Sequence, residues 1–355
     1  MRSPENIVWL TPGFAGDEKD TTAIPSLQLL ARHMKLNYPA IKLTIITFQY
    51  PFRRGSYSWN GIKIWSAGGR NGKFNRILTW IKVYRKIQKI NHENKIDLIH
   101  AFWLTEAVVI GQLFSKINKV PLLATAMGQD VKPENHYLPY IKLFLLNLSL
   151  ISDYQESFLQ DFKRLTILKV ISFGIEDVLF KGDRSKRTID VMGVGSLNPI
   201  KDFGLFIRII GDLATDFPGI RCMIVGEGSE RVELEGLIRD KHLEKNVVLE
   251  GTLDYESAIE RMHQARILLH TSSFEGQGLV ITEALAAGMQ VVSFPVGIAV
   301  TLKSPKLFTG RDREELTGIL IRLLRENKND FDPEIHFNIS DTFGEYLTIY
   351  KKLLN

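Results

Sequence analysis

The sequence has very little cysteine: Cys222 is the only one among 355 residues. A single cysteine cannot form an internal disulfide, which excludes a small disulfide-stapled scaffold and is compatible with a reducing compartment. The position of Cys222 in an apolar run predicts a small buried side chain. The chain also lacks fixed repeats and low-complexity tracts, which disfavours solenoids, propellers and fibrous proteins.

Segments that would target or anchor the chain in a membrane are also lacking. The first residues do not combine a basic start, an apolar centre and a small-residue cleavage site, so we expect a cytoplasmic protein. The most apolar long segment, 137–151, contains Lys142 and Asn147 and is shorter than the roughly 20 residues that cross a bilayer. We expect it to form a core helix or an interfacial helix.

Metal and dinucleotide signatures are few. No His/Cys/Asp cluster has the spacing of metal ligands, so we expect no metal and no other cofactor. Gly226 and Gly228 follow an apolar strand pattern, but the third glycine of a dinucleotide fingerprint is missing. This stretch is therefore not interpreted as an NAD site.

Positive charge is concentrated in the first half of the chain. The net charge is +11 over 1–172 and −6 over 173–355. Between Arg53 and Lys95 there are 11 basic residues and one acidic residue. Such a field attracts phosphates, nucleic acid or acidic lipid headgroups.

Short apolar runs alternate with helical patterns along the whole chain, which predicts an α/β fold with parallel sheets. The alternation restarts after 174–187, a polar and charged stretch that is typical of a domain linker. The expected strands are 6–10, 42–48, 97–101, 121–125, 148–151 and 166–171 in the first half, then 190–194, 221–225, 247–250, 267–270 and 290–294. We therefore predict two doubly wound domains, whose ligands bind beyond the carboxyl ends of the strands.

The most informative stretch, 271–288, follows an expected strand and continues into a helix that starts near Leu279. Its glycines let backbone N–H groups turn toward a ligand, and the positive end of the helix favours an anionic diphosphate. Glu275 and Glu283 add two hydrogen-bond acceptors for hydroxyl groups. The alternative is that one acid begins the helix and the other is a solvated surface residue.

A second polar loop follows the strand 190–194 and contains Lys201, just before a helix expected over 205–216. A lysine has the wrong charge for the start of a helix, but that charge suits contact with a bound phosphate. An ordinary surface lysine is the alternative.

The order and spacing of these motifs from about 190 to 294 resemble the donor-domain signature of the family 4 (group 1) retaining glycosyltransferases. The matching motifs are Val194-Gly-Ser-Leu with Lys201, Ile224-Val-Gly-Glu-Gly, Glu250-Gly-Thr, and Ser273-Phe-Glu-Gly-Gln-Gly with Glu283-Ala-Leu-Ala-Ala-Gly. The resemblance implies the GT-B fold, with two Rossmann-like domains facing a central cleft. The implied domains are 1–173 for the acceptor, 188–335 for the nucleotide-sugar, and a helix in 336–355 that crosses back to the first domain.

The resemblance also implies roles for individual residues. Glu283 would bind the ribose hydroxyls, Lys201 the donor diphosphate and Glu275 a donor-sugar hydroxyl. Asp130, in a loop that matches more loosely, would join Lys201 and Glu275 as a catalytic residue. The remaining donor contacts would be Ser196, Gly226, Gly228, Gly276, Gln277, Gly278 and Leu279, and the acceptor-side loops would contribute Gly13, Gly16, Met127 and Gly128. Many relatives have arginine at the position of Ser196 and histidine at that of Met127.

The segment 74–90 has a helical period and is strongly basic. One side carries Ile77, Trp80, Ile81, Tyr84 and Ile87, and another carries Lys82, Arg85, Lys86 and Lys89. Such a helix can lie on an anionic membrane, or its apolar side can simply cover the sheet. Nucleic acid is not expected as a partner, because the segment has little aromatic interleaving and no RNA or DNA motif.

These observations together predict an enzyme. We expect a retaining, metal-independent glycosyltransferase that moves a sugar from a nucleotide-diphosphate sugar to a polysaccharide or lipid-linked glycan, at the inner face of the cytoplasmic membrane. A noncatalytic subunit with the same fold and a nucleotide-sugar 2-epimerase are the alternatives.

Overall fold

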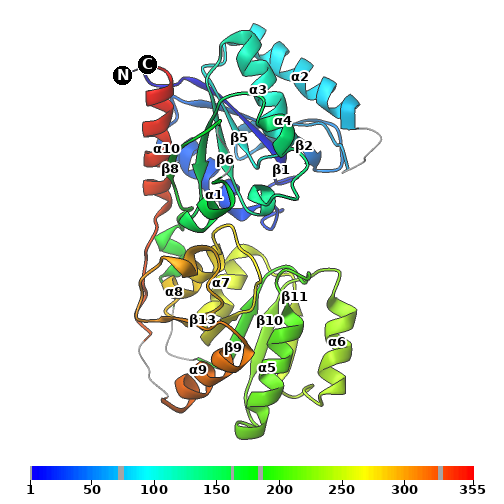
Figure 1. Ribbon diagram of the computed structural model, residues 1–355, viewed down its shortest axis with the longest axis vertical. Helices are drawn as coiled ribbons and strands as arrows, with labels where there is room; N and C mark the ends of the chain where they lie inside the picture. Colours follow the sequence, from blue (N-terminus) through cyan, green and yellow to red (C-terminus); the bar gives the residue numbers. More distant parts are fainter. Residues whose placement is uncertain (1, 71–75, 161–163, 183–186, 327–330) are drawn as a thin grey trace. The chain divides into compact units, whose positions relative to one another are not determined.

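A computed structural model describes residues 2–70, 76–160, 164–182, 187–326 and 331–355. The chain forms two compact units, 1–174 together with 339–355, and 175–338 (Figure 1). The division falls between Gly174 and Ile175, at the start of the stretch 174–187 that we expected to link two domains. Residues 183–186 of that stretch lie outside the described residues.

The first unit contains an eight-stranded sheet in the order β3-β4-β2-β1-β5-β6-β7-β8. All of its strand pairs are parallel except the hairpin β3–β4. The strands are β1 (Asn6–Gly13), β2 (Lys42–Tyr50), β3 (Gly55–Trp59), β4 (Ile62–Ser66), β5 (Leu98–Phe102), β6 (Leu122–Ala126), β7 (Leu146–Leu150) and β8 (Leu165–Val170). The hairpin was not predicted, although its two-residue turn, Asn60-Gly61, has the positive φ angles that this dipeptide favours.

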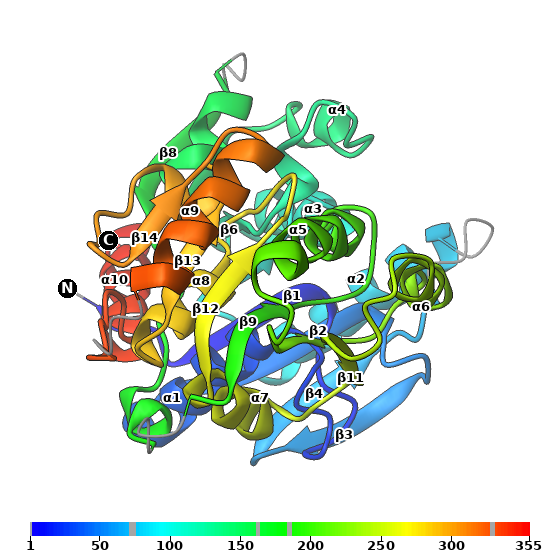
Figure 2. The ribbon, with the colours of Figure 1, turned by 90° about the horizontal axis from the view of Figure 1, so that it is seen from below.

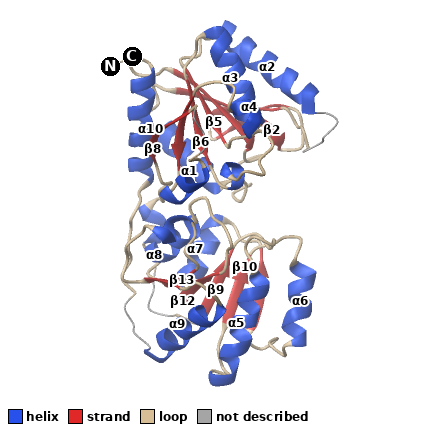
Figure 3. Ribbon diagram, in the orientation of Figure 1, coloured by secondary structure: helices blue, strands red, loops and turns tan. Residues whose placement is uncertain are grey.

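Helices cover both faces of this sheet (Figure 3). They are α1 (Pro25–Asn37), α2 (Arg76–Glu93), α3 (Glu106–Asn118), α4 (Leu138–Ile141) and α10 (Ile339–Leu353). The core or interfacial helix expected over 137–151 is wrong: the segment contains only the four-residue α4 and then the strand β7, which agrees with the strand that we also expected over 148–151. A central strand of a parallel sheet is buried on both faces, so its nearly continuous apolar sequence looks like that of a core helix.

Only part of the apolar side of α2 is buried in the first unit. Its buried residues are Thr79, Val83 and Ile87. Ile77 and Ile81, which were expected on the same apolar side as Ile87, are exposed. Residues 74 and 75 of the predicted segment lie outside the described residues.

The last helix, α10, is fixed to the first unit by buried polar contacts and also packs against α1 (Figure 1). His100 on β5 is fully buried, with its Nδ1 2.7 Å from the Tyr350 hydroxyl and its Nε2 2.7 Å from Thr125 Oγ1. Burial holds the pKa of His100 well below its usual value, so the ring is neutral. His100 is thus a structural residue that connects α10 to the centre of the sheet.

The second unit contains a fully parallel six-stranded sheet in the order β11-β10-β9-β12-β13-β14. Its strands are β9 (Ile189–Val194), β10 (Cys222–Val225), β11 (Val247–Gly251), β12 (Ala265–His270), β13 (Gln290–Ser293) and β14 (Leu307–Thr309). Its helices are α5 (Phe203–Asp216), α6 (Arg231–Asp240), α7 (Tyr255–His263), α8 (Leu279–Ala286) and α9 (Arg313–Glu326). The three-residue edge strand β14 was not predicted, and Cys222 is buried as expected.

The chain crosses from one side of each sheet to the other at a single point. In the second unit this point lies between β9 and β12, which are adjacent although three helices and two strands separate them in sequence (Figure 2). In the first unit it lies between β1 and β5. Ligands of doubly wound sheets bind beyond the carboxyl ends of the strands at such points. The remaining short elements are 3-10 turns at Gln129–Val131, Asp153–Phe158, Asp177–Phe180 and Gly297–Val300.

The anchoring of α10 gives a first prediction. Tyr350→Ala removes a fully buried aromatic side chain and leaves His100 Nδ1 without its partner, so we expect the first unit to lose about 3–5 kcal/mol of stability. All five tryptophans lie in the first unit, at positions 9, 59, 65, 80 and 103, so tryptophan fluorescence during urea unfolding reports on that unit alone. The exposed neighbour Lys352→Ala is the control, and equal unfolding midpoints in the two variants would contradict the prediction.

Candidate active site

Two loops of the second unit come together at the crossing point between β9 and β12. One follows β9 and contains Lys201, and the other follows β12 and contains Glu275. The loops are joined by a backbone hydrogen bond from Ser273 N to Ile200 O at 2.8 Å and by one from the Thr271 hydroxyl to Lys201 O at 2.8 Å. The fold thus brings together the two loops that sequence analysis had selected independently.

Lys201 and Glu275 form an ion pair between these loops. The distance from Lys201 Nζ to Glu275 Oε1 is 2.5 Å, and the side chains are 22% and 14% exposed. Burial alone would raise the pKa of Glu275, but the hydrogen bond from His270 and the charge of Lys201 outweigh it and lower the pKa to about 2. Glu275 is therefore a carboxylate at any physiological pH.

His270, the last residue of β12, is a member of this cluster that sequence reasoning missed. Its Nε2 lies 3.1 Å from Glu275 Oε1, and its Nδ1 lies 2.9 Å from Ser293 Oγ. The side chain is only 3% exposed. The available signal was a polar residue ending the otherwise apolar strand Ile267 to His270, directly before the glycine loop.

Glu283 has the opposite electrostatic environment from Glu275. It lies in α8, is 7% exposed, and its Oε1 accepts a hydrogen bond of 2.9 Å from the Tyr255 hydroxyl. Burial raises the pKa of Glu283 to about 7, although the hydrogen bond from Tyr255 and the charge of Lys201 oppose this. The two glutamates therefore differ in protonation near neutral pH, which is typical of sites where environment separates the roles of two acids.

The glycine loop ends at Gly278, which precedes the first residue of α8, Leu279. Gly278 has φ of 83°, a conformation that favours glycine, and no side chain caps the helix. Gly276, Gln277 and Gly278 are all buried. An uncapped helix start of this kind presents backbone N–H groups and a positive dipole end to an anion.

Gly226 and Gly228 are explained by close packing between backbones. A Cβ at Gly226 would lie 1.8 Å from Gly195 O, and one at Gly228 would lie 2.2 Å from Leu197 O. The two glycines therefore let the loop after β10 approach the loop after β9. Ser196 is exposed in the latter loop and brings no charge to it.

Asp130 lies in the first unit, and backbone donors occupy its carboxylate. It accepts hydrogen bonds from the backbone N–H of Leu104 at 2.7 Å, Gly128 at 2.6 Å and Met127 at 3.1 Å. Burial raises the pKa of Asp130 while these donors oppose the rise. Its contacts are those of a residue that positions the loops after β5 and β6, including Met127 and Gly128.

The loop after β1 carries the other residues that we expected on the acceptor side. Gly13 ends the strand, and Gly16 N donates to Asp20 Oδ2 at 2.8 Å. The same Asp20 oxygen accepts from the Tyr50 hydroxyl at 2.7 Å and raises the pKa of Tyr50 to about 12. Gly13 and Gly16 thus belong to an ordered loop at the carboxyl end of β1.

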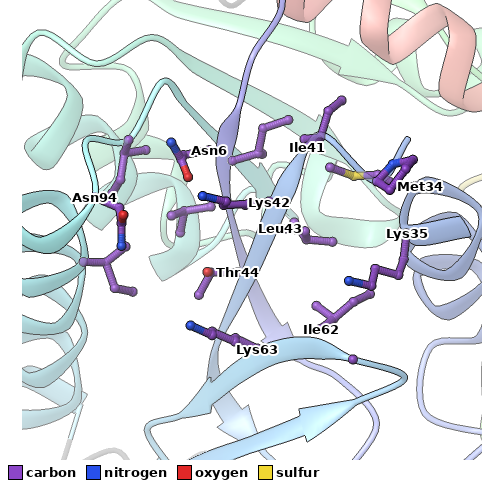
Figure 4. A pocket seen from close by; sticks show the side chains of 16 residues that line it. Asn6, Met34, Lys35, Ile41, Lys42, Leu43, Thr44, Ile62, Lys63 and Asn94 are labelled. Carbon is purple, nitrogen blue, oxygen red and sulfur yellow. The ribbon is translucent and has the colours of Figure 1, made fainter. Parts of the chain in front are cut away.

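A cavity of about 310 Å³ lies in the first unit, at the start of strands β1, β2 and β4 (Figure 4). Lys35, Lys42 and Lys63 line it. This is the opposite end of the strands from the loops described above, and Lys35 lies in the last turn of α1, where a cation complements the helix dipole. We assign no ligand to this cavity. Among the described residues, no group of three or more His, Cys, Asp or Glu side chains is placed to hold a metal ion.

Two family models match the chain. Residues 175–330 match the model described as glycosyl transferases group 1, and residues 42–152 match the model described as glycosyl transferase 4-like. The chain belongs to the group 1 glycosyltransferases. The resemblance stated from the sequence is thereby confirmed, and the match to the group 1 model includes both glutamates and Lys201.

Solved structures confirm that this glycosyltransferase has the two-domain GT-B fold. Sucrose-phosphate synthase from Thermosynechococcus elongatus is similar over 98% of this chain and 99% of its own, with a TM-score of 0.78 and 17% identity. HepE from Anabaena, solved with UDP and glucose, is similar over 99% of this chain and 97% of its own, with a TM-score of 0.69 and 18% identity.

A curated relative is similar to part of the glycosyltransferase sequence. The poly(ribitol-phosphate) alpha-N-acetylglucosaminyltransferase of Staphylococcus aureus is 27% identical over 209 residues, which is 58% of this chain and 36% of the relative. The chain thus spans little more than a third of that relative's length.

The raised pKa of Glu283 gives a prediction for stability. Between pH 4.5 and 7 the unfolded chain ionises this carboxyl while the folded one keeps its proton, so the stability of the second unit falls by about 3 kcal/mol as pH rises through that range. Glu283→Gln should remove this fall. The measurement is denaturant unfolding followed by circular dichroism. The transition of the second unit is the one that circular dichroism detects and tryptophan fluorescence does not. Glu256→Gln, which changes an exposed glutamate, is the control and should lose the same stability with rising pH as the wild type. If Glu283→Gln also lost stability with pH as the wild type does, the raised pKa of Glu283 would be contradicted.

Proposed function

We propose that this protein transfers a sugar from a nucleotide-diphosphate sugar to a glycan acceptor. The observation that carries the proposal is the juxtaposition of the Lys201–Glu275 pair with the uncapped start of α8 and the buried Glu283. Glu283 would accept hydrogen bonds from the ribose hydroxyls, and Lys201 with the amides of Gln277, Gly278 and Leu279 would hold the diphosphate. Glu275 would hold a hydroxyl of the donor sugar.

This arrangement suits the charge that develops during transfer. The bond between the sugar C1 and the diphosphate oxygen breaks, and its electron pair stays on the diphosphate. The acceptor hydroxyl oxygen forms the new bond to C1, and its proton passes to the departing diphosphate. A cation and preorganised amides next to that oxygen stabilise the charge as it grows. We propose that the configuration at C1 is retained, as the family resemblance implies.

The positive charge of Lys201 also supports a reaction that needs no metal ion. Lys201 can offset the charge of the diphosphate, which a divalent cation does in other transferases. The chain does contain an Asp-x-Asp pair at 330 and 332, but residue 330 lies outside the described residues. Sensitivity of the activity to EDTA therefore decides the metal requirement.

A noncatalytic subunit is the second candidate function. It is favoured by the absence of a charge at Ser196 and of a hydrogen-bond donor in the side chain of Met127. The ion pair between Lys201 and Glu275 argues for turnover, because it supplies a cation that can stabilise a departing diphosphate. A 2-epimerase would need acid and base groups near the sugar, and the carboxylate of Asp130 is already occupied by backbone donors.

The acceptor side of the proposal includes a membrane surface. Large apolar side chains, 42–80% exposed, lie on three helical segments of the first unit: Ile77, Leu78 and Ile81 on α2, Leu113 and Ile117 on α3, and Leu143 and Leu145 just after α4. We call these seven residues the three-helix surface. Such a concentration of exposed apolar side chains typically marks a partner or membrane contact.

Helix α3 packs against both α2 and α4 (Figure 1). Trp80 of α2 contacts Tyr137 next to α4 with ring centroids 6.4 Å apart, and Tyr84 of α2 contacts Phe114 of α3 at 5.9 Å. The basic residues on these two helices are Arg76, Lys82, Arg85, Lys86 and Lys89 on α2 and Lys116 on α3. Apolar side chains surrounded by cations complement an anionic lipid bilayer.

We therefore propose that the enzyme works at the inner face of the cytoplasmic membrane, on a polysaccharide or lipid-linked glycan. None of the helices in the described part of the chain is long and apolar enough to span a bilayer. Contact through the three-helix surface would be peripheral.

The catalytic role of Lys201 gives a kinetic prediction. Lys201→Ala should lower the rate of nucleoside-diphosphate release from the preferred donor by about 10²–10³-fold, because it removes one of the groups that stabilise the leaving diphosphate. Lys245→Ala, an exposed lysine of the same unit, should keep the wild-type rate. Wild-type activity should persist in EDTA. A wild-type rate in Lys201→Ala, or full loss in EDTA, would contradict the proposed chemistry.

The three-helix surface gives a binding prediction. Co-sedimentation with phosphatidylglycerol-containing vesicles should fall at least tenfold in Ile81→Asp/Ile117→Asp, because two apolar contacts are replaced by charges that anionic lipid repels. Leu36→Asp is the control: it changes a 71% exposed leucine on α1, outside the surface. Binding should also be weak to pure phosphatidylcholine. Equal binding by both variants, or by both vesicle types, would contradict the membrane assignment.

A further inference from the structure

The carboxylate of Glu275 faces two nitrogen groups. Its Oε1 lies 2.5 Å from Lys201 Nζ and 3.1 Å from His270 Nε2. Each contact is attractive only when the nitrogen carries a proton, because an ionised carboxylate cannot donate a hydrogen bond. His270 therefore has a proton on Nε2.

The other nitrogen of His270 also carries a proton in this arrangement. Its Nδ1 is 2.9 Å from Ser293 Oγ, and the single hydroxyl proton of Ser293 is donated to Phe294 O at 2.7 Å. With that proton directed at Phe294 O, Ser293 accepts in the contact with His270 and Nδ1 donates. With protons on both nitrogens, the ring is an imidazolium. The neutral ring would require the Ser293 hydroxyl to turn away from Phe294 O and donate to Nδ1 instead.

The charge of the cluster follows from the state of this ring. With a neutral His270, the cation of Lys201 and the carboxylate of Glu275 cancel. With the imidazolium, two cations share one carboxylate, and the cluster has a net positive charge. No other charged side chain of the described residues makes a hydrogen bond or ion pair with His270 or Glu275.

We propose that His270 is a positioning residue whose imidazolium neutralises Glu275 and so leaves the charge of Lys201 available to the donor diphosphate. This inference rests on the proposed function, because it assigns a diphosphate to that cluster. Without the second cation, Lys201 would have to leave Glu275 in order to bind the phosphates, and an uncompensated carboxylate would stay beside an anionic donor. His270 thus acts on the donor through Glu275 and need not touch it.

The test compares a charged ligand with an uncharged one of the same base. His270→Gln keeps an N–H donor for Glu275 but removes the positive charge. UDP, GDP, ADP and dTDP are titrated calorimetrically into wild-type protein, and the tightest-binding one is then compared with its own nucleoside in both proteins. We expect the affinity for the diphosphate to fall about tenfold in His270→Gln, and the affinity for the nucleoside to stay the same.

Two results would overturn the inference. One is an unchanged diphosphate affinity in His270→Gln. The other is an equal loss for diphosphate and nucleoside, which would indicate a general distortion of the site. Ser293→Ala is a milder variant that keeps His270 and Glu275 but removes the acceptor for Nδ1–H; it should also weaken diphosphate binding and leave nucleoside binding unchanged.

A spectroscopic measurement decides the protonation of His270 without any ligand. In ¹⁵N NMR of histidine-labelled wild-type protein at pH 7, assigned with His270→Gln, both ring nitrogens of His270 should carry protons. A neutral ring would contradict the inference even if the diphosphate binds. The wild-type protein could also show an imidazolium and yet bind no nucleoside diphosphate. That result would count against the proposed function, and it would overturn this inference by removing the ligand that the inference assigns to the cluster.

Discussion

The contact between Lys201 and Glu275 depends on the strand order of the second sheet. The two residues are 74 positions apart in sequence, and they meet because β9 and β12 are neighbours at the point where the chain crosses the sheet. The glycines of the loop after β10 let that loop pack against the loop containing Lys201. The position of the cation is thus determined by backbone packing on one side and by the Glu275 carboxylate on the other.

The two glutamates show how one loop and helix can hold acids of different character. Glu275 stays ionised because two nitrogen donors face it, and the pKa of Glu283 rises because burial is opposed only by one hydroxyl and a more distant cation. In the proposed function, these states suit their tasks. A neutral Glu283 avoids placing a second negative charge beside an anionic donor, whereas the charge of Glu275 keeps Lys201 in place.

The fold class and most strands could be predicted from sequence because apolar runs between helical patterns are strong, local signals. The errors had local physical causes. Segment 137–151 was interpreted as a helix, although its end was also expected as a strand, because a doubly buried strand has no alternation. Strand β14 is a three-residue edge strand with little signal. For α2 the sequence left open whether the apolar side covers the sheet or lies on a membrane. Ile87 is buried whereas Ile77 and Ile81 are exposed, so the period of the sequence alone does not determine which residues the neighbouring elements cover.

The candidate site was only partly accessible to sequence reasoning. Lys201, Glu275 and Glu283 could be selected because they lie in loops and at a helix start with recognisable spacing. His270 and Tyr255 could not, because their importance comes from contacts with Glu275 and Glu283 that exist only in the folded chain. Gly226 and Gly228 were selected as ligand contacts, whereas the close approach of two backbones is sufficient to explain them.

The second unit is proposed to bind a nucleotide-diphosphate sugar through Glu283 and the Lys201–Glu275 pair. The most direct test is the thermal shift of wild-type protein and of Glu283→Ala with UDP-, GDP-, ADP- and dTDP-sugars. We expect sugars of one nucleotide to stabilise the wild-type protein and Glu283→Ala to abolish this stabilisation. No shift with any donor, or the same shift in Glu283→Ala, would contradict this binding mode.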